Sequence, residues 1–167
     1  MTTSTPSHEQ DKLYPRTHYE AVLDIRYACV FSRLNVVLYD RIDVFFGFVG
    51  LAGGSAAVAS VLTQQPGAAV TAGLTLAVMS ILERLVNAAR KSEQHKQAVA
   101  QFAELDARAP SMTLAEVDAE LARLRAAAPQ GFAGLAEVAF NANLRSNGRA
   151  SHCISLPAWS RVLRLMA

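Results

Sequence analysis

A run of 39 residues without Asp, Glu, Lys, Arg or His, from Val44 to Leu82, constrains the fold of this chain more than any other feature. All 16 Lys and Arg residues and all 14 Asp and Glu residues lie on the two sides of this run. A soluble domain seldom leaves so long a stretch uncharged, because its helices need a polar face toward water. The run therefore indicates a segment whose solvent is the lipid bilayer.

The uncharged run divides into two apolar segments around a turn. Residues 44–62 would rise about 28 Å as a helix, close to the roughly 30 Å hydrocarbon core of a bilayer. Residues 63–67 contain a Pro–Gly pair, which is typical of a turn. The second segment, residues 67–86, reaches spanning length when the polar ends of Glu83 and Arg84 extend to the interface. The sequence therefore predicts a two-helix transmembrane hairpin.

Positive charges flank the predicted hairpin closely, whereas its turn carries none. The flanking cations are Arg26, Arg33 and Arg41 before it and Arg84, Arg90, Lys91 and Lys96 after it. By the positive-inside rule, both flanks lie in the cytoplasm and the turn at residues 64–67 lies outside. We therefore expect a multi-pass protein of the cytoplasmic (inner) membrane with both termini cytoplasmic. The expected membrane-flanking residues are Arg41, Asp43, Glu83 and Arg84.

The residues before the hairpin predict a lead-in helix. Thr17 and Glu20 have the spacing of a capping box, in which each side chain accepts a hydrogen bond from a free backbone N–H group. Arg26, Arg33 and Asp40 then share one stripe of the helix surface, and the rest of that surface is largely apolar. We expect an amphipathic helix that approaches the membrane.

The residues after the hairpin also predict helices. The second hairpin helix is expected to continue unbroken to about Ala107, with a seam for another helix at Leu85, Ala88, Ser92, His95, Val99 and Phe102. Thr113 and Glu116 form a second capping box, which opens a helix that ends near Ala128. Further helices are expected at residues 132–145 and after Pro157. No segment shows the alternating pattern of a strand.

These elements predict an all-α protein built around a two-helix transmembrane hairpin. Residues 1–15 are expected to form a disordered N-terminus. Residues 16–109 contain the lead-in helix, the hairpin (44–62 and 67–86) and its helical extension. Residues 110–167 form a small C-terminal helical region.

Small residues recur at intervals of four on both hairpin helices, which lets helices approach closely in a membrane. The expected packing and oligomerisation residues are Gly50, Gly54, Ala52, Ala56, Ser60, Ala69, Gly73 and Ala77. One interpretation is that they pack the two helices of one hairpin together. Another is that two small faces of the first helix serve both the hairpin and neighbouring subunits, because one hairpin cannot enclose a water-filled path. Both interpretations predict close contacts at these positions.

The sequence offers no catalytic or metal-binding pattern, so we expect no enzyme and no cofactor. The histidines are scattered, and His95 is expected on a helix surface. His152 and Cys153 are neighbours in the chain, and adjacent residues rarely orient for nucleophilic catalysis. Cys29 and Cys153 fit reduced thiols of the cytoplasm. The net charge of +2 and the lack of a basic cluster argue against a nucleic-acid partner.

The arrangement resembles the SLATT family of two-transmembrane effectors in bacterial nucleotide-signalling conflict systems. The similar parts are the lead-in helix at residues 16–43, the hairpin at residues 45–82, and the long helix carrying Ala-Arg-Lys-Ser-Glu-Gln-His at residues 89–95. The resemblance implies an antiviral-defence effector that oligomerises. When a separate sensor is activated, such an effector forms pores or perturbs the membrane. It implies no catalytic residues.

Three functional hypotheses remain open from the sequence. The first is the membrane effector, with the lipid bilayer and further copies of the chain as its partners. The second is a holin-like phage lysis protein, although about 80 residues follow the hairpin, where such proteins have a short charged tail. The third is a soluble all-helical interaction or structural module with the hairpin as its core, because Ser, Thr and Gly make the two segments less apolar than typical spans.

Overall fold

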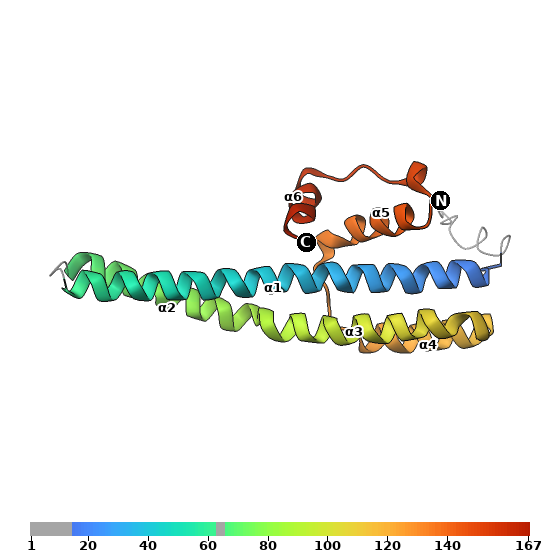
Figure 1. The fold of residues 1–167 in the computed structure, drawn as a ribbon, viewed down its shortest axis with the longest axis horizontal. Helices are drawn as coiled ribbons and strands as arrows, with labels where there is room; N and C mark the ends of the chain where they lie inside the picture. Colours follow the sequence, from blue (N-terminus) through green and yellow to red (C-terminus); the bar gives the residue numbers. More distant parts are fainter. Residues whose placement is uncertain (1–14, 63–65) are drawn as a thin grey trace, which may run out of the picture.

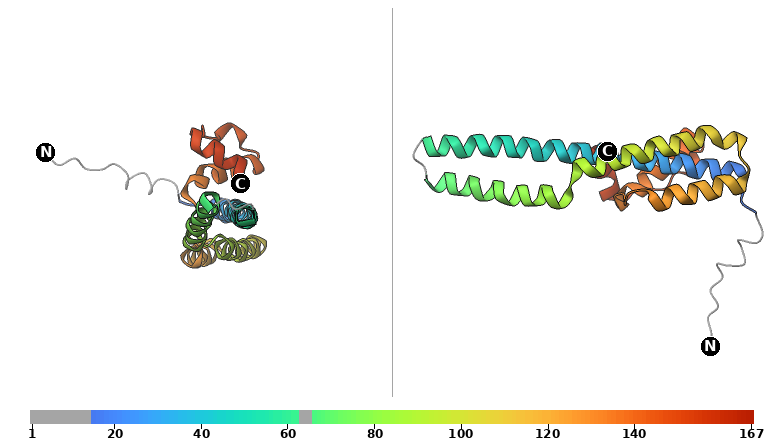
Figure 2. Two further views of the ribbon diagram at one scale, coloured as in Figure 1. Left: turned by 90° about the vertical axis from the view of Figure 1, so that its left-hand side faces the viewer. Right: turned by 90° about the horizontal axis from the view of Figure 1, so that it is seen from below.

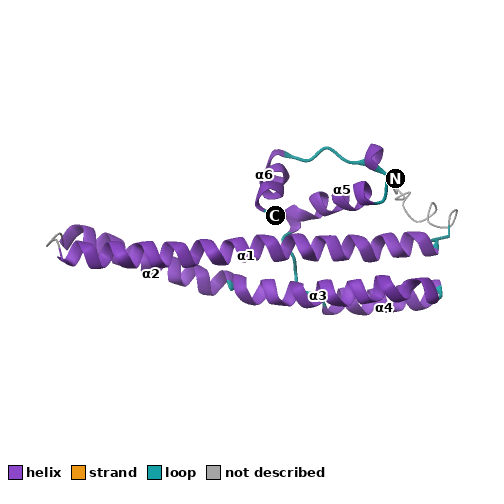
Figure 3. Cartoon of the chain, in the orientation of Figure 1, coloured by secondary structure: helices purple, strands orange, loops and turns teal. Residues whose placement is uncertain are grey.

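A computed structural model describes residues 15–62 and 66–167, with the side chains of 60–62 and 66 left out of the description. Within these residues the structure contains helices, turns and loops and no strand, as predicted (Figure 3). The predicted disordered N-terminus lies almost wholly outside the described residues, as does most of the predicted turn at 63–67. The predicted all-α class is confirmed for the part of the chain that is described.

The first helix, α1 (His18–Leu62), has 45 residues and runs the full length of the molecule (Figure 1). Its predicted capping box is present: the Thr17 backbone N donates to Glu20 Oε2 at 2.8 Å, and the Glu20 backbone N donates to Thr17 Oγ1 at 3.3 Å. A helix of this length extends about 68 Å, more than twice the thickness of a bilayer core. Less than half of α1 is therefore needed to cross a membrane.

The chain returns along α1 through α2 (Pro66–Val86) and α3 (Ala88–Arg108). The prediction of one unbroken helix to Ala107 is wrong at Asn87, which adopts the left-handed conformation with φ 48° and ψ 51°. Asparagine tolerates this conformation better than most residues. The break lets the chain change direction between α2 and α3 (Figure 2), so that the two helices follow different paths beside α1.

Helices α3 and α4 (Leu114–Ala127) pack against the first half of α1. Ile25 of α1, Phe102 and Leu105 of α3, and Val117 and Leu121 of α4 are fully or almost fully buried in one core. The Thr113–Glu116 capping box that opens α4 is present as predicted. α4, which follows the predicted boundary at residue 110, completes the core of the preceding helices.

The chain then crosses α1 and covers its other side. Residues 128–132 lead from α4 past α1 to α5 (Ala136–Ser146) and α6 (Ala158–Met166) (Figure 1). Leu38, Leu135 and Leu163 form a second buried cluster there. Short 3-10 helices lie at Ala109–Ser111, Ala133–Leu135 and Ala150–His152. The first half of α1 is thus packed on two sides, rather than being an amphipathic helix with one free face. Arg26 and Arg33 remain exposed, as predicted.

We call residues 44–62 and 66–86 the hairpin, and residues 16–43 and 88–167 the bundle. The hairpin extends beyond the bundle at one end of the molecule (Figure 1). The two buried clusters of hydrophobic residues lie in the bundle.

Candidate functional site

The outward surface of the hairpin is apolar and exposed. Both hairpin helices are long and apolar enough to cross a membrane, and no residue in the most apolar stretch of either is fully buried. Leu51, for example, is 75% exposed. The exposed large apolar residues are Val44, Phe45, Phe48, Leu51, Val58, Val70, Leu74, Val78, Ile81, Leu82 and Leu85. Soluble monomers rarely expose so extended an apolar surface, so this surface is the first candidate for a functional site.

The inner contact of the hairpin forms around a single glycine. Phe46, Val49, Gly53 and Ala57 recur at three or four residues along α1 and are half-buried. A Cβ atom added at Gly53 would lie 2.6 Å from Leu76 Cδ2 on α2. The missing side chain at Gly53 therefore allows the close approach of the two helices.

The predicted packing residues lie mostly outside this inner contact. Gly54 and Ala69 are half-buried, and the side chain of Ser60 lies outside the described residues. Five others are exposed: Gly50, Ala52, Ala56, Gly73 and Ala77. A Cβ atom at Gly50 or Gly54 would meet nothing within 4 Å. The interpretation that these two glycines pack one hairpin together is thus corrected, because an interval of four residues does not reveal which side of a helix faces its neighbour.

Three hydroxyl groups in the hairpin, those of Ser55, Thr71 and Thr75, donate hydrogen bonds within their own helices. Ser55 Oγ donates to the Leu51 carbonyl at 2.9 Å. Thr71 and Thr75 donate to the carbonyls of Gly67 and Thr71, each also at 2.9 Å. Such bonds to the preceding turn remove the need for water as a partner. The Ser and Thr residues that made these segments less apolar are therefore compatible with a lipid environment.

Charged residues mark the end of the apolar surface. Arg41, Asp43, Glu83 and Arg84, the four predicted flanking residues, are all exposed at the base of the hairpin. Asp43, Glu83 and Arg84 line a hollow of about 390 Å³ beside the break at Asn87. The structure thus brings together three of the four residues from two helices, at the level where a lipid surface would meet water.

A polar cluster joins α1 and α3 just beyond the base of the hairpin. Ser92 Oγ donates a short hydrogen bond to Asp40 Oδ1, and Lys96 Nζ lies 3.4 Å from the same oxygen. Lys91 Nζ lies 5.4 Å from the centre of the Tyr39 ring. This cluster ties α3 to α1 immediately after the change of direction at Asn87.

His95 is buried in this region, which corrects the expectation of a surface position. Only 1% of the residue is exposed, because the seam of α3 faces α1. Its ring stacks on Tyr39 with 5.8 Å between ring centroids, and neither ring nitrogen makes a well-formed hydrogen bond within the described residues. Burial lowers the pKa of His95, and the nearby Lys91 ammonium adds to this effect, whereas the Gln130 backbone opposes it.

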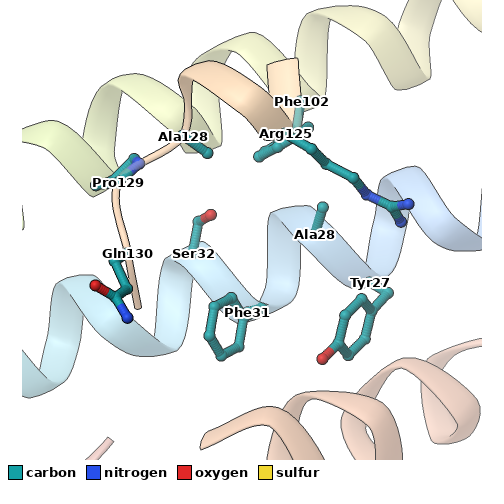
Figure 4. A pocket seen from close by; sticks show the side chains of 9 residues that line it. All are labelled: Tyr27, Ala28, Phe31, Ser32, Phe102, Arg125, Ala128, Pro129 and Gln130. Atoms are coloured by element: carbon teal, nitrogen blue, oxygen red, sulfur yellow. The ribbon is translucent and has the colours of Figure 1, made fainter. Parts of the chain in front are cut away.

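A cavity of about 320 Å³ lies between α1, α3, α4 and the crossing segment (Figure 4). Tyr27 and Phe31 stack on its α1 side with 6.2 Å between ring centroids. Arg125 lies on its α4 side and forms an ion pair with Asp24 at 3.6 Å. Arg125 is the one charged side chain that lines this cavity, and it is already paired with the Asp24 carboxylate. The other lining residues are mainly apolar or aromatic.

The only neighbouring thiol and imidazole noted in the sequence do not face one another. Cys153 Sγ lies 3.7 Å from the Asn141 carbonyl, and His152 Nδ1 lies 3.2 Å from Ser151 Oγ. Cys29 and Cys153 are both free thiols. Burial raises the pKa of Cys29, which keeps this thiol protonated and unreactive. Neither cysteine has the surroundings of a nucleophile.

The described residues therefore define an all-helical protein with two candidate membrane-spanning helices packed as a hairpin. In comparisons with known proteins, no family model, no curated protein and no solved structure matches this chain. The resemblance to the SLATT family stays a prediction of the sequence.

Three features of this site were not predicted from the sequence. They are the hairpin contact at Gly53, the burial of His95, and the position of α6 beside the base of the hairpin. The buried seam of α3 contained a signal for the second, since His95 lies in register with Ala88, Ser92 and Phe102, all of which are buried. No local signal indicated where α6 would pack, because that depends on the path of the crossing segment.

Proposed function

We propose that this chain is a membrane effector that inserts its hairpin into the cytoplasmic membrane and assembles with further copies to permeabilise or perturb it. The observation that carries the proposal is the exposed apolar surface of both hairpin helices, bounded by charged residues at its base. Lipid covers such a surface without leaving a polar group unsatisfied. The bundle, with both termini, would then lie on the cytoplasmic side.

The soluble alternative has less support. It requires the hairpin to be the core of a helical bundle, whereas the buried hydrophobic clusters of the described residues lie elsewhere. The hairpin helices contact each other, but their outer sides have no protein cover within one chain. The hydroxyls of Ser55, Thr71 and Thr75 are compatible with lipid, because each is bonded to a carbonyl of its own helix.

Assembly is the part of the proposal that uses the small residues. Gly50, Gly54 and Gly73 each have open space where a Cβ atom would lie, so another helix can approach the backbone closely there. Two helices alone cannot enclose a path for ions, and several hairpins must combine. The open space at these three glycines favours contacts between subunits through the outer surface of the hairpin. Gly53 instead lies in the contact between the two helices of one hairpin.

The proposal draws its trigger from the resemblance to SLATT effectors. A separate sensor or nucleotide-signalling protein would then switch the assembled chain from a silent to an active state. The bundle is the part of the chain that such a protein could contact from the cytoplasm.

The experiment that tests the proposal combines crosslinking and leakage in cells that overproduce the chain. We expect crosslinked oligomers in the membrane fraction and uptake of a small membrane-impermeant dye. Gly50→Leu should reduce both, whereas Val58→Leu, an apolar change at an already large exposed residue, should reduce neither.

Two results would contradict the proposal. A membrane-bound chain that stays monomeric in crosslinking would exclude assembly. Release of a cytoplasmic enzyme as large as an endolysin, rather than dye uptake alone, would favour the holin-like alternative.

A further inference from the structure

The last helix of the chain, α6, has three distinct sides. Ser160 and Leu163 are buried against the bundle. Arg161 and Arg164 form an exposed cationic side. The third side is apolar and exposed, with 60% exposure at Trp159 and 77% at Leu165, and also includes Val162 and Met166. An apolar side with an aromatic residue, next to a cationic side, is typical of helices that lie in the interface of a bilayer.

The end of α6 is attached at the base of the hairpin. Arg41 Nη1 donates a hydrogen bond of 2.8 Å to the Leu165 carbonyl. Leu163 packs on Leu38 of α1, and Ala167 packs against the same cluster. Since the uncharged run begins at Val44, α6 lies at the level of α1 where the apolar surface begins.

The direction of α6 also suits a membrane surface. Figure 1 shows α6 running across α1, whereas α5 runs alongside it. The view from the hairpin end in Figure 2 shows α6 from its side rather than end-on. If α1 crosses the bilayer, α6 extends along the bilayer surface at its cytoplasmic face.

We propose that α6 is an interfacial helix, whose apolar side enters the headgroup region of the bilayer while Arg161 and Arg164 contact anionic lipid headgroups. This inference rests on the proposed function, because it requires the hairpin to be inserted. It assigns the exposed side of α6 to lipid, as a continuation of the lipid-facing surface that begins at Val44. The helix would hold α5 and the rest of the C-terminal region against the membrane.

Lipid suits this surface better than a second copy of the chain. Two copies that met through α6 would bring their Arg161 and Arg164 side chains close together, and like charges oppose such a contact. Anionic headgroups complement the same arginines. Trp159 also fits this assignment, because tryptophan is enriched at membrane–water interfaces.

Trp159 makes the test direct, because it is the one tryptophan of the sequence. The full chain is reconstituted into phosphatidylcholine vesicles with or without phosphatidylglycerol, and brominated acyl chains serve as the quencher. We expect Trp159 emission to shift to shorter wavelength and to lose intensity with brominated lipid, more strongly when phosphatidylglycerol is present. Val162→Glu combined with Leu165→Glu should abolish the quenching, and Arg161→Gln with Arg164→Gln should remove its dependence on phosphatidylglycerol.

A matched control moves the fluorophore away from the predicted interface. Trp159→Phe with Tyr19→Trp places the single tryptophan at the exposed start of α1, at the end of the bundle far from the hairpin, and should give no quenching. Hairpin insertion is measured separately, by whether the chain stays in the same vesicles during alkaline carbonate extraction. A chain that is extracted contradicts the proposed function itself. An inserted chain whose Trp159 is not quenched overturns the assignment of α6 to lipid, and a blue-shifted but unquenched Trp159 would identify a protein cover instead.

Discussion

Buried polar side chains determine how the crossing segment passes α1. Asn35 Oδ1 accepts a hydrogen bond of 2.7 Å from the Phe132 backbone N, and Asn35 Nδ2 donates to the Phe31 carbonyl at 2.8 Å. Gly131 passes so close to α1 that an added Cβ atom would lie 2.4 Å from Phe31 Cε1. One asparagine and one glycine thus fix the point at which the chain moves from one side of α1 to the other.

The burial of His95 predicts a pH-dependent stability. The folded state holds the pKa of His95 below its ordinary value of about 6.5, so the unfolded state binds more protons below that pH. The contribution of His95 to the free energy of unfolding is therefore complete above about pH 6.5 and is lost as the pH falls through the lowered pKa of the folded state. We expect the thermal midpoint in detergent, followed by Trp159 fluorescence, to fall between pH 7.5 and pH 5.5.

The His95→Phe variant isolates this effect, because it keeps an aromatic ring against Tyr39 and removes the titrating group. We expect a flatter dependence of the midpoint on pH than in the wild-type chain. Equal slopes for the two proteins would show that His95 does not titrate differently on folding.

The hairpin glycines give a matched pair of substitutions. Gly53→Leu places a side chain where Leu76 already lies, so we expect it to destabilise the hairpin by about 1–3 kcal/mol through overpacking. Gly54→Leu enters open space within the chain and should leave the stability of the isolated subunit nearly unchanged. Thermal unfolding in a detergent that keeps the chain monomeric measures both. A larger loss for Gly54→Leu would contradict the inner contact described here.

At the scale of the elements, local signals predicted helices better than their junctions. The capping boxes at Thr17 and Thr113, with no Gly or Pro in α1 before Gly47, were sufficient to predict where α1 and α4 begin. The break at Asn87 had no such signal, because an isolated asparagine in a helical pattern usually stays helical. Tertiary packing decides there, since α2 and α3 contact different parts of α1.

The break at Asn87 can be tested by two substitutions that we expect to differ in their effect on stability. Asn87→Gly should be tolerated, because glycine adopts a positive φ without strain. Asn87→Ala should cost about 1–2 kcal/mol, the usual penalty for a left-handed conformation, or straighten the junction. Thermal unfolding of the two variants in parallel checks this. Equal stability of Asn87→Gly and Asn87→Ala would mean that the left-handed conformation is not required.

The hairpin predicts a topology that cysteine labelling can measure. After replacement of Cys29 and Cys153, a cysteine at Gly67, an exposed position at the start of α2, should react with an impermeant thiol reagent added to intact cells. A cysteine at the exposed Ser111, at the far end of α3, should react only after the cells are opened. The reverse pattern would overturn the orientation argued from the flanking cations.

For the molecule as a whole, the hairpin followed from the sequence and the bundle did not. The uncharged run revealed the two apolar segments of the hairpin because charge is absent from Val44 to Leu82. The packing of α3 and α4 on one side of α1, and of α5 and α6 on the other, depends on contacts between residues far apart in the chain. Examples are the hydrogen bonds of Arg26 with Asp106 and Asn147. No local periodicity contains that information, and so the sequence did not predict how residues 110–167 pack against α1.

Extraction from cell membranes measures directly whether the hairpin of this chain is embedded in lipid. Membranes are washed with alkaline carbonate, and the pellet is then treated with detergent. We expect the chain to remain in the pellet through the wash and to enter solution only with detergent, because the hairpin's exposed apolar surface requires lipid or a substitute for it. Recovery of the chain in the carbonate supernatant as a monodisperse, detergent-free monomer would contradict the account.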